Sequence, residues 1–409
     1  MVIRSYLTTA LGTAFCCIAI LLGLFLPIES FADGTQNVGA GDKGYEPAII
    51  EVLERLESGE LERALSLVEL HLVNHPKSRI AHLLRADILN AQGNPFYEIG
   101  QGSALPVKDL QGLKHQIKAR WQHSKVHSLV AKEKVPSSLL HIGDHPYVLV
   151  ADMQNGRLYV YQNSEGQPEL IRDYYMSVGS AGYGKQVEGD NKTPIGVYHV
   201  NRYIEGKRLP DLYGKGAFPV NYPNKYDRFL KRTGYGIWLH GTPSTTYARE
   251  PWTSEGCFVL SNEDLLDVAK FVSAEAKTPV ILSDHIEWVG RQELDRKRRK
   301  FLSVVNKWQS DWESVDTSAY LSNYTTDRLN FGATSYHSWA AKKKKLNKSK
   351  TFIQVDIDVE EMFLYPGETD MFVVSFKQNY LSNNFQSQQR KKQYWKKDNL
   401  GVWKIIYEG

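Results

Sequence analysis

The sequence has 409 residues, of which 42% are hydrophobic and 23% are charged, and its formal net charge is +4. This length predicts two or three domains, and the hydrophobic content excludes a chain that is disordered throughout. The nearly balanced charge excludes a strongly basic protein that coats nucleic acid. The cysteines, Cys16, Cys17 and Cys257, are too few for a disulfide scaffold or a cysteine-based zinc site.

Residues 1–32 have the pattern of a secretory signal peptide. A positively charged start precedes the apolar residues 14–28, and small residues precede an expected cleavage after Ala32. The alternative is an uncleaved inner-membrane anchor, because the apolar run from 10 to 28 is about as long as a bilayer span requires. We therefore expect a periplasmic protein in which Cys257 is the one cysteine of the mature chain.

Residues 33–140 are predicted to form a helical module. Apolar residues recur at helical spacing over 47–92, with breaks at Gly59 and at Asn74-His75-Pro76, so three helices are expected. Helix–turn–helix units of this size resemble tetratricopeptide repeats. A further helix with a basic face is expected over 107–133. This module would serve homodimerisation or a protein partner.

Residues 141–286 are predicted to be mostly β-structure. The segments 147–151 and 158–161 flank an Asn155-Gly156 turn, which is typical of a hairpin. A single helix is expected at about 261–273, where a capping pattern precedes apolar residues. Further strands are expected at 169–178, 195–203, 236–240, 256–260 and 278–282.

Residues 287–409 begin with a helix and continue in long strands. The pattern resembles the NTF2-like fold, in which helices pack into a curved antiparallel sheet. We interpret the basic runs 296–300 and 342–345 as solvated faces. The strands are expected at 352–355, 371–376, 391–395 and 402–407.

Two local patterns suggest sites that other residues contradict. Gly179 to Lys185 has the G-x-x-x-x-G-K spacing of a phosphate loop, but Gln186 stands where that loop needs Ser or Thr. We interpret these glycines as a tight loop beside a site. His141 and His145 have a spacing seen in metal sites, but no third ligand is evident in the sequence. No metal and no cofactor are expected.

His240 and Cys257 are candidates for a catalytic pair. His240 ends one apolar strand, and Cys257 follows Gly256 immediately before another. A cysteine nucleophile acts as the thiolate, and its ordinary pKa of about 8.5 must be lowered by a neighbour such as histidine. These residues alone leave two readings open: a nucleophile, or a buried structural cysteine near an unrelated histidine.

Three segments together resemble the L,D-transpeptidase family with its YkuD-type catalytic domain. These are Thr193 to Tyr198, which reads Thr-Pro-x-Gly-x-aromatic, then His240-Gly241, then Ser254 to Cys257. The resemblance covers about residues 145–284. It implies a multidomain α+β protein with a helical module, a mostly-β L,D-transpeptidase catalytic domain and a C-terminal NTF2-like domain.

The resemblance also implies roles for single residues. Cys257 would attack the carbonyl of the third residue of a peptidoglycan stem peptide, release D-alanine and form a thioester, and His240 would activate the thiol. The Gly241 carbonyl would orient the imidazole. The amides of Gly256 and Cys257 would face the oxyanion, and Ser254 would support the loop.

The sequence departs from the family pattern on both sides of the cysteine. Glu255 stands where many members have histidine, and Val259 stands where many have arginine. We expect Glu255 to point outward or to contact a cationic substrate group, because a carboxylate facing a thiolate opposes its ionisation. Tyr247 and Arg249 are candidate lid or substrate contacts.

These departures leave the fate of the thioester open. The first hypothesis is transfer to a second stem peptide. The second is transfer to water, as in the cell-shape L,D-carboxypeptidases of helical bacteria, whose three-part layout this chain also resembles. A third hypothesis is a non-catalytic scaffold that binds the cell wall. The expected partners are peptidoglycan stem peptides, and nucleic acid is not expected.

Overall fold

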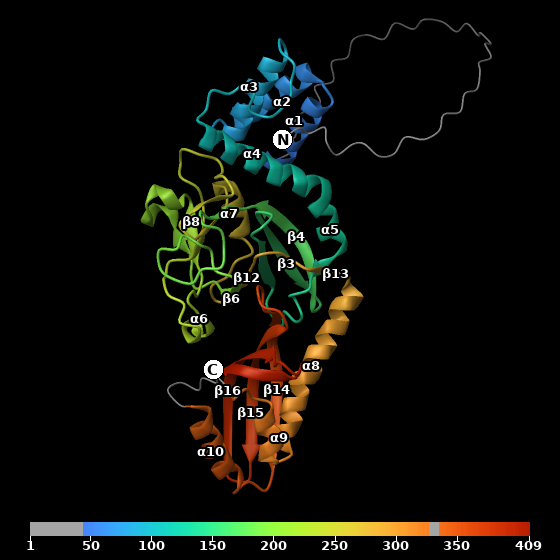
Figure 1. Ribbon diagram of the computed structural model, residues 1–409, viewed down its shortest axis with the longest axis vertical. Helices are drawn as coiled ribbons and strands as arrows, with labels where there is room; N and C mark the ends of the chain where they lie inside the picture. The colour runs from blue at the N-terminus through green and yellow to red at the C-terminus, as the bar shows by residue number, and fades with distance from the viewer. Residues whose placement is uncertain (1–43, 327–334) are drawn as a thin grey trace, which may run out of the picture. The chain divides into compact units, whose positions relative to one another are not determined.

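The computed structural model describes residues 44–326 and 335–409 (Figure 1). The described residues fall into two compact units, one of residues 44–76 and 80–110 and one of residues 77–79 and 111–409. The signal segment predicted at 1–32 lies outside the described residues. Within the described ranges, none of the helices combines the length and the apolar content that a membrane span needs.

The first unit is helical, as its apolar spacing predicts. Its core is formed by one face of each amphipathic helix, and Gly59, whose φ is 78°, makes the first turn. Buried Asp87 accepts hydrogen bonds from the amides of Gly100 and Gly102 at 2.6 and 2.8 Å, which fixes the segment after the third helix. The helices are α1 (Tyr45–Glu57), α2 (Leu61–Asn74) and α3 (Arg79–Ala91).

The helix predicted over 107–133 is a continuous helical run with a π-helical interruption. It consists of α4 (Val107–Gln122), a π-turn (His123–His127) and α5 (Ser128–Glu133). In the second unit, the buried guanidinium of Arg120 lies 4.1 Å from the ring centre of Tyr175. This contact attaches α4 to the sheet that follows.

Two sheets form the central part of the second unit. Leu149 and Leu282 of one sheet and Leu239 and Phe258 of the other are buried in a common core. The first sheet has the order β4 (Gln167–Tyr175), β3 (Arg157–Ser164), β2 (Tyr147–Asp152), β12 (Pro279–Ser283) and β6 (Gly196–His199). The second has the order β11 (Phe258–Val259), β9 (Trp238–His240), β8 (Gly216–Pro219) and β7 (Ile204–Glu205).

The structure differs from the sequence prediction of this part in several details. No strand was predicted at β7 or β8. The strand expected at 169–178 divides into β4 and β5 (Val178–Gly179), and β5 pairs in parallel with β10 (Trp252–Ser254). The expected single helix is shorter, α7 (Asn262–Val268), although the Ser261 side chain caps it as predicted. A second helix, α6 (Lys225–Phe229), begins at a capping box. It was missed because five residues are too few to show helical periodicity.

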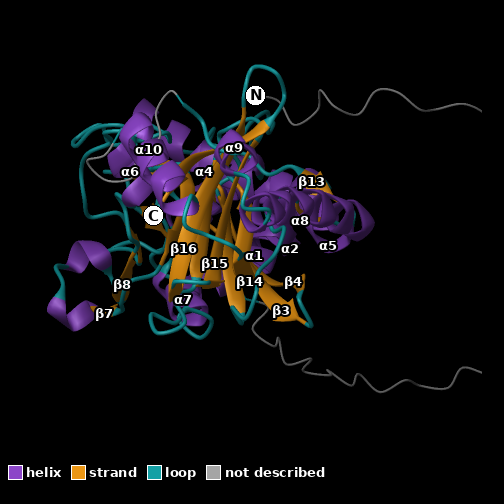
Figure 2. Cartoon of the chain, turned by 90° about the horizontal axis from the view of Figure 1, so that it is seen from below, coloured by secondary structure: helices purple, strands orange, loops and turns teal. Residues whose placement is uncertain are grey.

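The C-terminal part has the helix-on-sheet pattern predicted for an NTF2-like fold. Four antiparallel strands lie in sequence order, and in Figures 1 and 2 the long helix α8 runs along their sheet. Phe301 and Trp308 of α8 share a core with Phe372 and Trp395 of the sheet. The elements are α8 (Arg291–Glu313), α9 (Thr317–Ser322), α10 (Tyr336–Asn347), β14 (Ile353–Leu364), β15 (Met371–Ser382), β16 (Phe385–Lys397) and β17 (Trp403–Glu408). The short strands β1 (Val135–Pro136) and β13 (Trp288–Val289) pair before α8 begins.

Candidate active site

His240 is the last residue of β9, and its ring is held in one tautomer. Its Nδ1 lies 2.7 Å from the carbonyl oxygen of Gly241. Because a carbonyl oxygen can only accept, Nδ1 carries the proton and Nε2 presents a lone pair. Burial lowers the pKa of His240 to about 4, and the positive charge of Arg249 acts in the same direction. The imidazole is therefore a neutral base at physiological pH.

Cys257 lies on the same face of the sheet as His240. The strands β11 and β9 are parallel, with Phe258 opposite Leu239 and Val259 opposite His240. Phe258 and Leu239 point into the core, so the residues that alternate with them, Cys257 and His240, point to the other face. The two groups that acyl transfer needs are thus brought to one side of neighbouring strands.

The Cys257 thiol is partly exposed and protonated. Its Sγ donates to the carbonyl oxygen of Gly236 at 3.3 Å. Removal from water raises the pKa of Cys257 to about 11, although the backbone of Trp238 and the positive charges of Arg249 and Lys185 oppose the rise. At neutral pH the thiol therefore needs a base before it can attack a carbonyl.

The loop that carries Cys257 depends on Gly256. Its φ is 119°, which L side chains rarely adopt, and an added Cβ would lie 2.8 Å from the carbonyl oxygen of Lys192. Ser254 Oγ donates to the Cys257 carbonyl at 2.6 Å and accepts from the Gly256 amide at 3.1 Å. The Gly256 amide is thus used to hold the loop, whereas the family resemblance implies that it faces the oxyanion.

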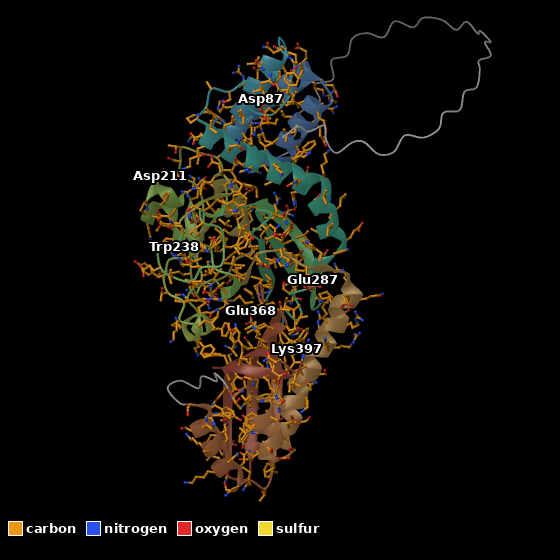
Figure 3. All side chains as sticks on the ribbon, viewed as in Figure 1. Asp87, Asp211, Trp238, Glu287, Glu368 and Lys397 are labelled. Carbon is orange, nitrogen blue, oxygen red and sulfur yellow. The ribbon has the colours of Figure 1, made fainter. Side chains whose placement is uncertain are left out.

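A second loop positions the His240 side of the site. Asn262 donates to the Thr242 carbonyl and accepts from the Lys215 amide, both at 2.8 Å. An added Cβ on Gly241 would collide with the Asn262 side chain, so glycine is needed here for close packing. The Tyr213 ring lies 5.0 Å from the His240 ring and 4.9 Å from the Trp238 ring. Trp238 is labelled in Figure 3.

Asn262 and Tyr213 were missed by the sequence analysis. Asn262 follows the predicted cap of a helix, and its side chain reaches a loop that is distant in the sequence. Tyr213 stands in a short 3₁₀ turn without a pattern. Neither position carries a local signal that distinguishes it from a surface residue.

The other predicted site residues take different positions. Arg249 and Glu255 lie close enough to Cys257 to affect its pKa with opposite signs, and Glu255 is exposed, as the sequence analysis expected. Tyr247 directs its hydroxyl to Glu263 Oε2 at 3.0 Å. Arg249 and Glu255 therefore act on the thiol through charge, whereas Tyr247 joins its loop to α7.

The glycine-rich loop from Gly179 to Lys185 is closed by internal contacts. The nearly buried ammonium of Lys185 contacts Asp190 Oδ1 at 2.7 Å and the Val187 carbonyl at 3.1 Å. Thr193 Oγ1, from the Thr-Pro motif, accepts from the Gly179 amide at 2.9 Å. The lysine is committed to an ion pair beside the Cys257 loop and does not project toward a phosphate.

Comparisons with known proteins agree with this geometry. Residues 146–282 match the family model of the L,D-transpeptidase catalytic domain, YkuD, and residues 300–409 match that of the Cds6 C-terminal NTF2-like domain. None of the curated proteins searched matches the chain significantly.

Three solved structures share the layout of the chain. Bd1075 from Bdellovibrio bacteriovorus is 28% identical, with 68% of this chain and 98% of that chain covered and a TM-score of 0.59. The helical cell shape determining protein Pgp2 from Campylobacter jejuni is 26% identical, with 69% and 97% covered and a TM-score of 0.57. A variant of Pgp2 is also 26% identical, with 75% and 100% covered and a TM-score of 0.58. Residues 146–282 of this chain therefore form a catalytic domain of the L,D-transpeptidase (YkuD) family, and residues 300–409 form an NTF2-like domain.

Proposed function

We propose that this chain is an exported cysteine enzyme that cleaves peptidoglycan stem tetrapeptides between the third residue and the terminal D-alanine. The observation that carries the proposal is that His240 ends β9 with the lone pair of Nε2 exposed by its tautomer, while Cys257 immediately precedes β11, the parallel neighbour of β9. Export rests on the signal pattern of residues 1–32. The family match supports the substrate class.

The proposed reaction begins with proton transfer from Cys257 Sγ to His240 Nε2. The sulfur attacks the carbonyl carbon of the third stem residue, and the carbonyl becomes an oxyanion. The bond to D-alanine then breaks, His240 returns its proton to the leaving amine, and a thioester remains on Cys257. Because the Gly256 amide is engaged with Ser254, the Cys257 amide is the proposed donor to the oxyanion.

The thioester can then react with water or with the amine of a second stem. Water gives a tripeptide, and an amine gives a 3→3 cross-link. A role in cell shape is proposed on the likeness to Pgp2, a helical cell shape determining protein. Either outcome uses the same Cys257 and His240.

The test is digestion of purified tetrapeptide muropeptides followed by mass spectrometry. A tripeptide monomer identifies a carboxypeptidase, and a 3→3 dimer identifies a transpeptidase. Cys257→Ala should form neither product, and the same variant should lose the covalent adduct that a carbapenem forms with the wild-type thiol. A folded wild-type protein that gains no adduct and releases no D-alanine would instead be a non-catalytic wall-binding scaffold.

A further inference from the structure

A cluster of metal-ligating side chains lies outside the active site of the second unit. His145, His199 and Glu361 each offer one ligand atom, and the three atoms lie within 4.8 Å of one another. It is the one group of three such residues within this spacing in the part of the chain that the structure describes. The side chains are 17%, 14% and 6% exposed, so the cluster is largely shielded from water.

The tautomer of His145 leaves its inner nitrogen without a proton. His145 Nδ1 lies 3.2 Å from the Ala276 carbonyl oxygen, which can only accept, so Nδ1 carries the proton of the neutral ring. In the neutral ring the lone pair of Nε2 faces Glu361 Oε2 at 3.2 Å, and either a second proton on the ring or a bound cation removes the repulsion between these two atoms. A cation between them turns a repulsive contact into two coordination bonds.

The third ligand is His199, the last residue of β6. Its Nε2 lies 2.9 Å from the same oxygen, Glu361 Oε2. Zinc bonds to imidazole nitrogen and carboxylate oxygen at about 2.0–2.2 Å, which places tetrahedral ligand atoms about 3.3 Å apart. The two separations from Glu361 Oε2, 2.9 and 3.2 Å, are close to this value, and all three ligand atoms lie within 4.8 Å of one another.

The second oxygen of Glu361 is held by other groups. Glu361 Oε1 accepts from Ser375 Oγ at 2.8 Å and from Lys392 Nζ at 3.1 Å. The contact with Ser375 orients Oε2 toward the two imidazoles, as outer partners do at metal sites, whereas the ammonium of Lys392 opposes a second positive charge nearby. A bulge in β14 between Val359 and Glu361 directs the side chain to this side of the sheet.

The ligands are anchored on regular elements and come from both matched domains. His199 ends β6, its amide donates to Asn221 Oδ1 at 2.9 Å, and it pairs with Pro279 of β12. His145 precedes β2, whereas Glu361 belongs to β14 of the C-terminal sheet. An ion held by all three would join the catalytic domain to the NTF2-like domain.

We propose that His145, His199 and Glu361 bind one divalent transition-metal ion, with zinc the best fit, and that this ion links the two domains of the second unit. Two imidazoles and one carboxylate are a common zinc ligand set, and a water molecule would take the fourth position. The ligands do not include Cys257 or His240, and the role proposed for the ion is to join the two domains. Lys392 competes with it for the charge of Glu361.

The test is zinc binding by the purified full chain after treatment with a chelator. Equilibrium dialysis against Zn²⁺ with elemental analysis should give about one zinc per chain, and Zn²⁺ should raise the midpoint of thermal unfolding. His199→Ala and Glu361→Gln should each weaken binding by about tenfold or more. His141→Ala is the matched control, because His141 Nε2 bonds only the Val359 carbonyl at the same junction, and this variant should bind zinc like the wild type.

Lys392→Met is a second test, in which all three ligands are kept and tighter binding is expected. Removing the competing cation should tighten zinc binding by about tenfold, because a nearby like charge opposes the ion. Circular dichroism checks that each variant is folded. The proposal is overturned if neither the wild type nor Lys392→Met binds zinc saturably, or if folded His199→Ala and Glu361→Gln bind it as tightly as the wild type. The cluster would then be an ion-pair network that contains Lys392.

Discussion

His240 and His145, both in the second unit, are oriented by the same kind of hydrogen bond but face different groups. His240 and His145 each donate Nδ1–H to a backbone carbonyl and present Nε2 inward. The strand next to His240 is preceded by the Cys257 thiol, so the proposed role of Nε2 is that of a base. Beside His145 stands the carboxylate of Glu361, so Nε2 can act only as a ligand or as a charged partner. The residue opposite the lone pair decides the chemistry.

The sites also differ in how the chain assembles them. His240 ends β9 and Cys257 immediately precedes the adjacent strand β11, and glycines fix the loop beside each of them. Glu361 is separated from His199 by 162 positions and from His145 by 216. A site built from neighbouring strands leaves short motifs in the sequence. A site built across two domains leaves only isolated residues.

The largest effect is expected when His240 is replaced, because the proposed base is then lost. In His240→Gln the thiol must ionise unaided, and with a pKa of about 11 only about one thiol in ten thousand is ionised at pH 7. Carbapenem acylation of Cys257 should therefore slow by about 10³- to 10⁴-fold. Its rate should then rise about tenfold for each pH unit between 7 and 10, because the thiolate fraction rises by that factor.

The control for this prediction is His285→Gln, which replaces an exposed histidine. It should acylate at the wild-type rate with a wild-type pH profile. A His240→Gln rate that is near the wild-type rate, or that does not change with pH, would show that another group activates the thiol. Mass spectrometry of the intact protein at timed intervals measures both variants.

The difference between the sites explains how much the sequence could predict. The helices of residues 45–91 and the hairpin of β2 and β3 follow from periodicity and turn residues, and the structure confirms them. The sequence pairs His145 with His141 by spacing, but His141 bonds the Val359 carbonyl and is not part of the group that His145 forms among the described residues. The true neighbours of His145 come from β6 and β14, and no local pattern predicts that contact.

The contacts within the loops of the site could not be predicted from the sequence either. The glycine before Cys257 predicts a turn, but not that Ser254 Oγ captures the Gly256 amide. The Gly241–Asn262 contact depends on how α7 approaches the loop after β9. Such hydrogen bonds are determined by tertiary packing, which hydrophobic periodicity does not encode.

A smaller effect is expected at Gly256, where the backbone positions the thiol. Gly256→Ala must adopt a φ near 119° and must place its Cβ against the Lys192 carbonyl. Relief of this strain should displace Cys257 and reduce D-alanine release by about 10²-fold, because misplacement by about 1 Å can cost that much. The matched control is Gly182→Ala, whose φ is 83° but whose Cβ would meet open space.

These two glycine variants distinguish backbone strain from steric contact. Both should lose stability, by about 1–3 kcal/mol each, in urea unfolding followed by tryptophan fluorescence. Only Gly256→Ala should also lose most of its activity. Equal losses of activity in the two variants would mean that the glycine-rich loop near Lys185 matters as much as the Cys257 loop itself.

The smallest effect is expected from the charges of Arg249 and Glu255, which shift the pKa of the Cys257 thiol. The positive charge of Arg249 lowers the pKa of Cys257, and the negative charge of Glu255 raises it. Arg249→Met should therefore shift the pH profile of iodoacetamide alkylation to higher pH, and Glu255→Gln should shift it to lower pH. Because the groups are partly exposed, solvent screening limits each change to about a few-fold in rate at pH 8. Arg208→Met, which removes an exposed arginine outside the site, should leave the profile unchanged. Shifts of the same sign for Arg249→Met and Glu255→Gln would show that loop packing, and not charge, governs the reactivity of Cys257.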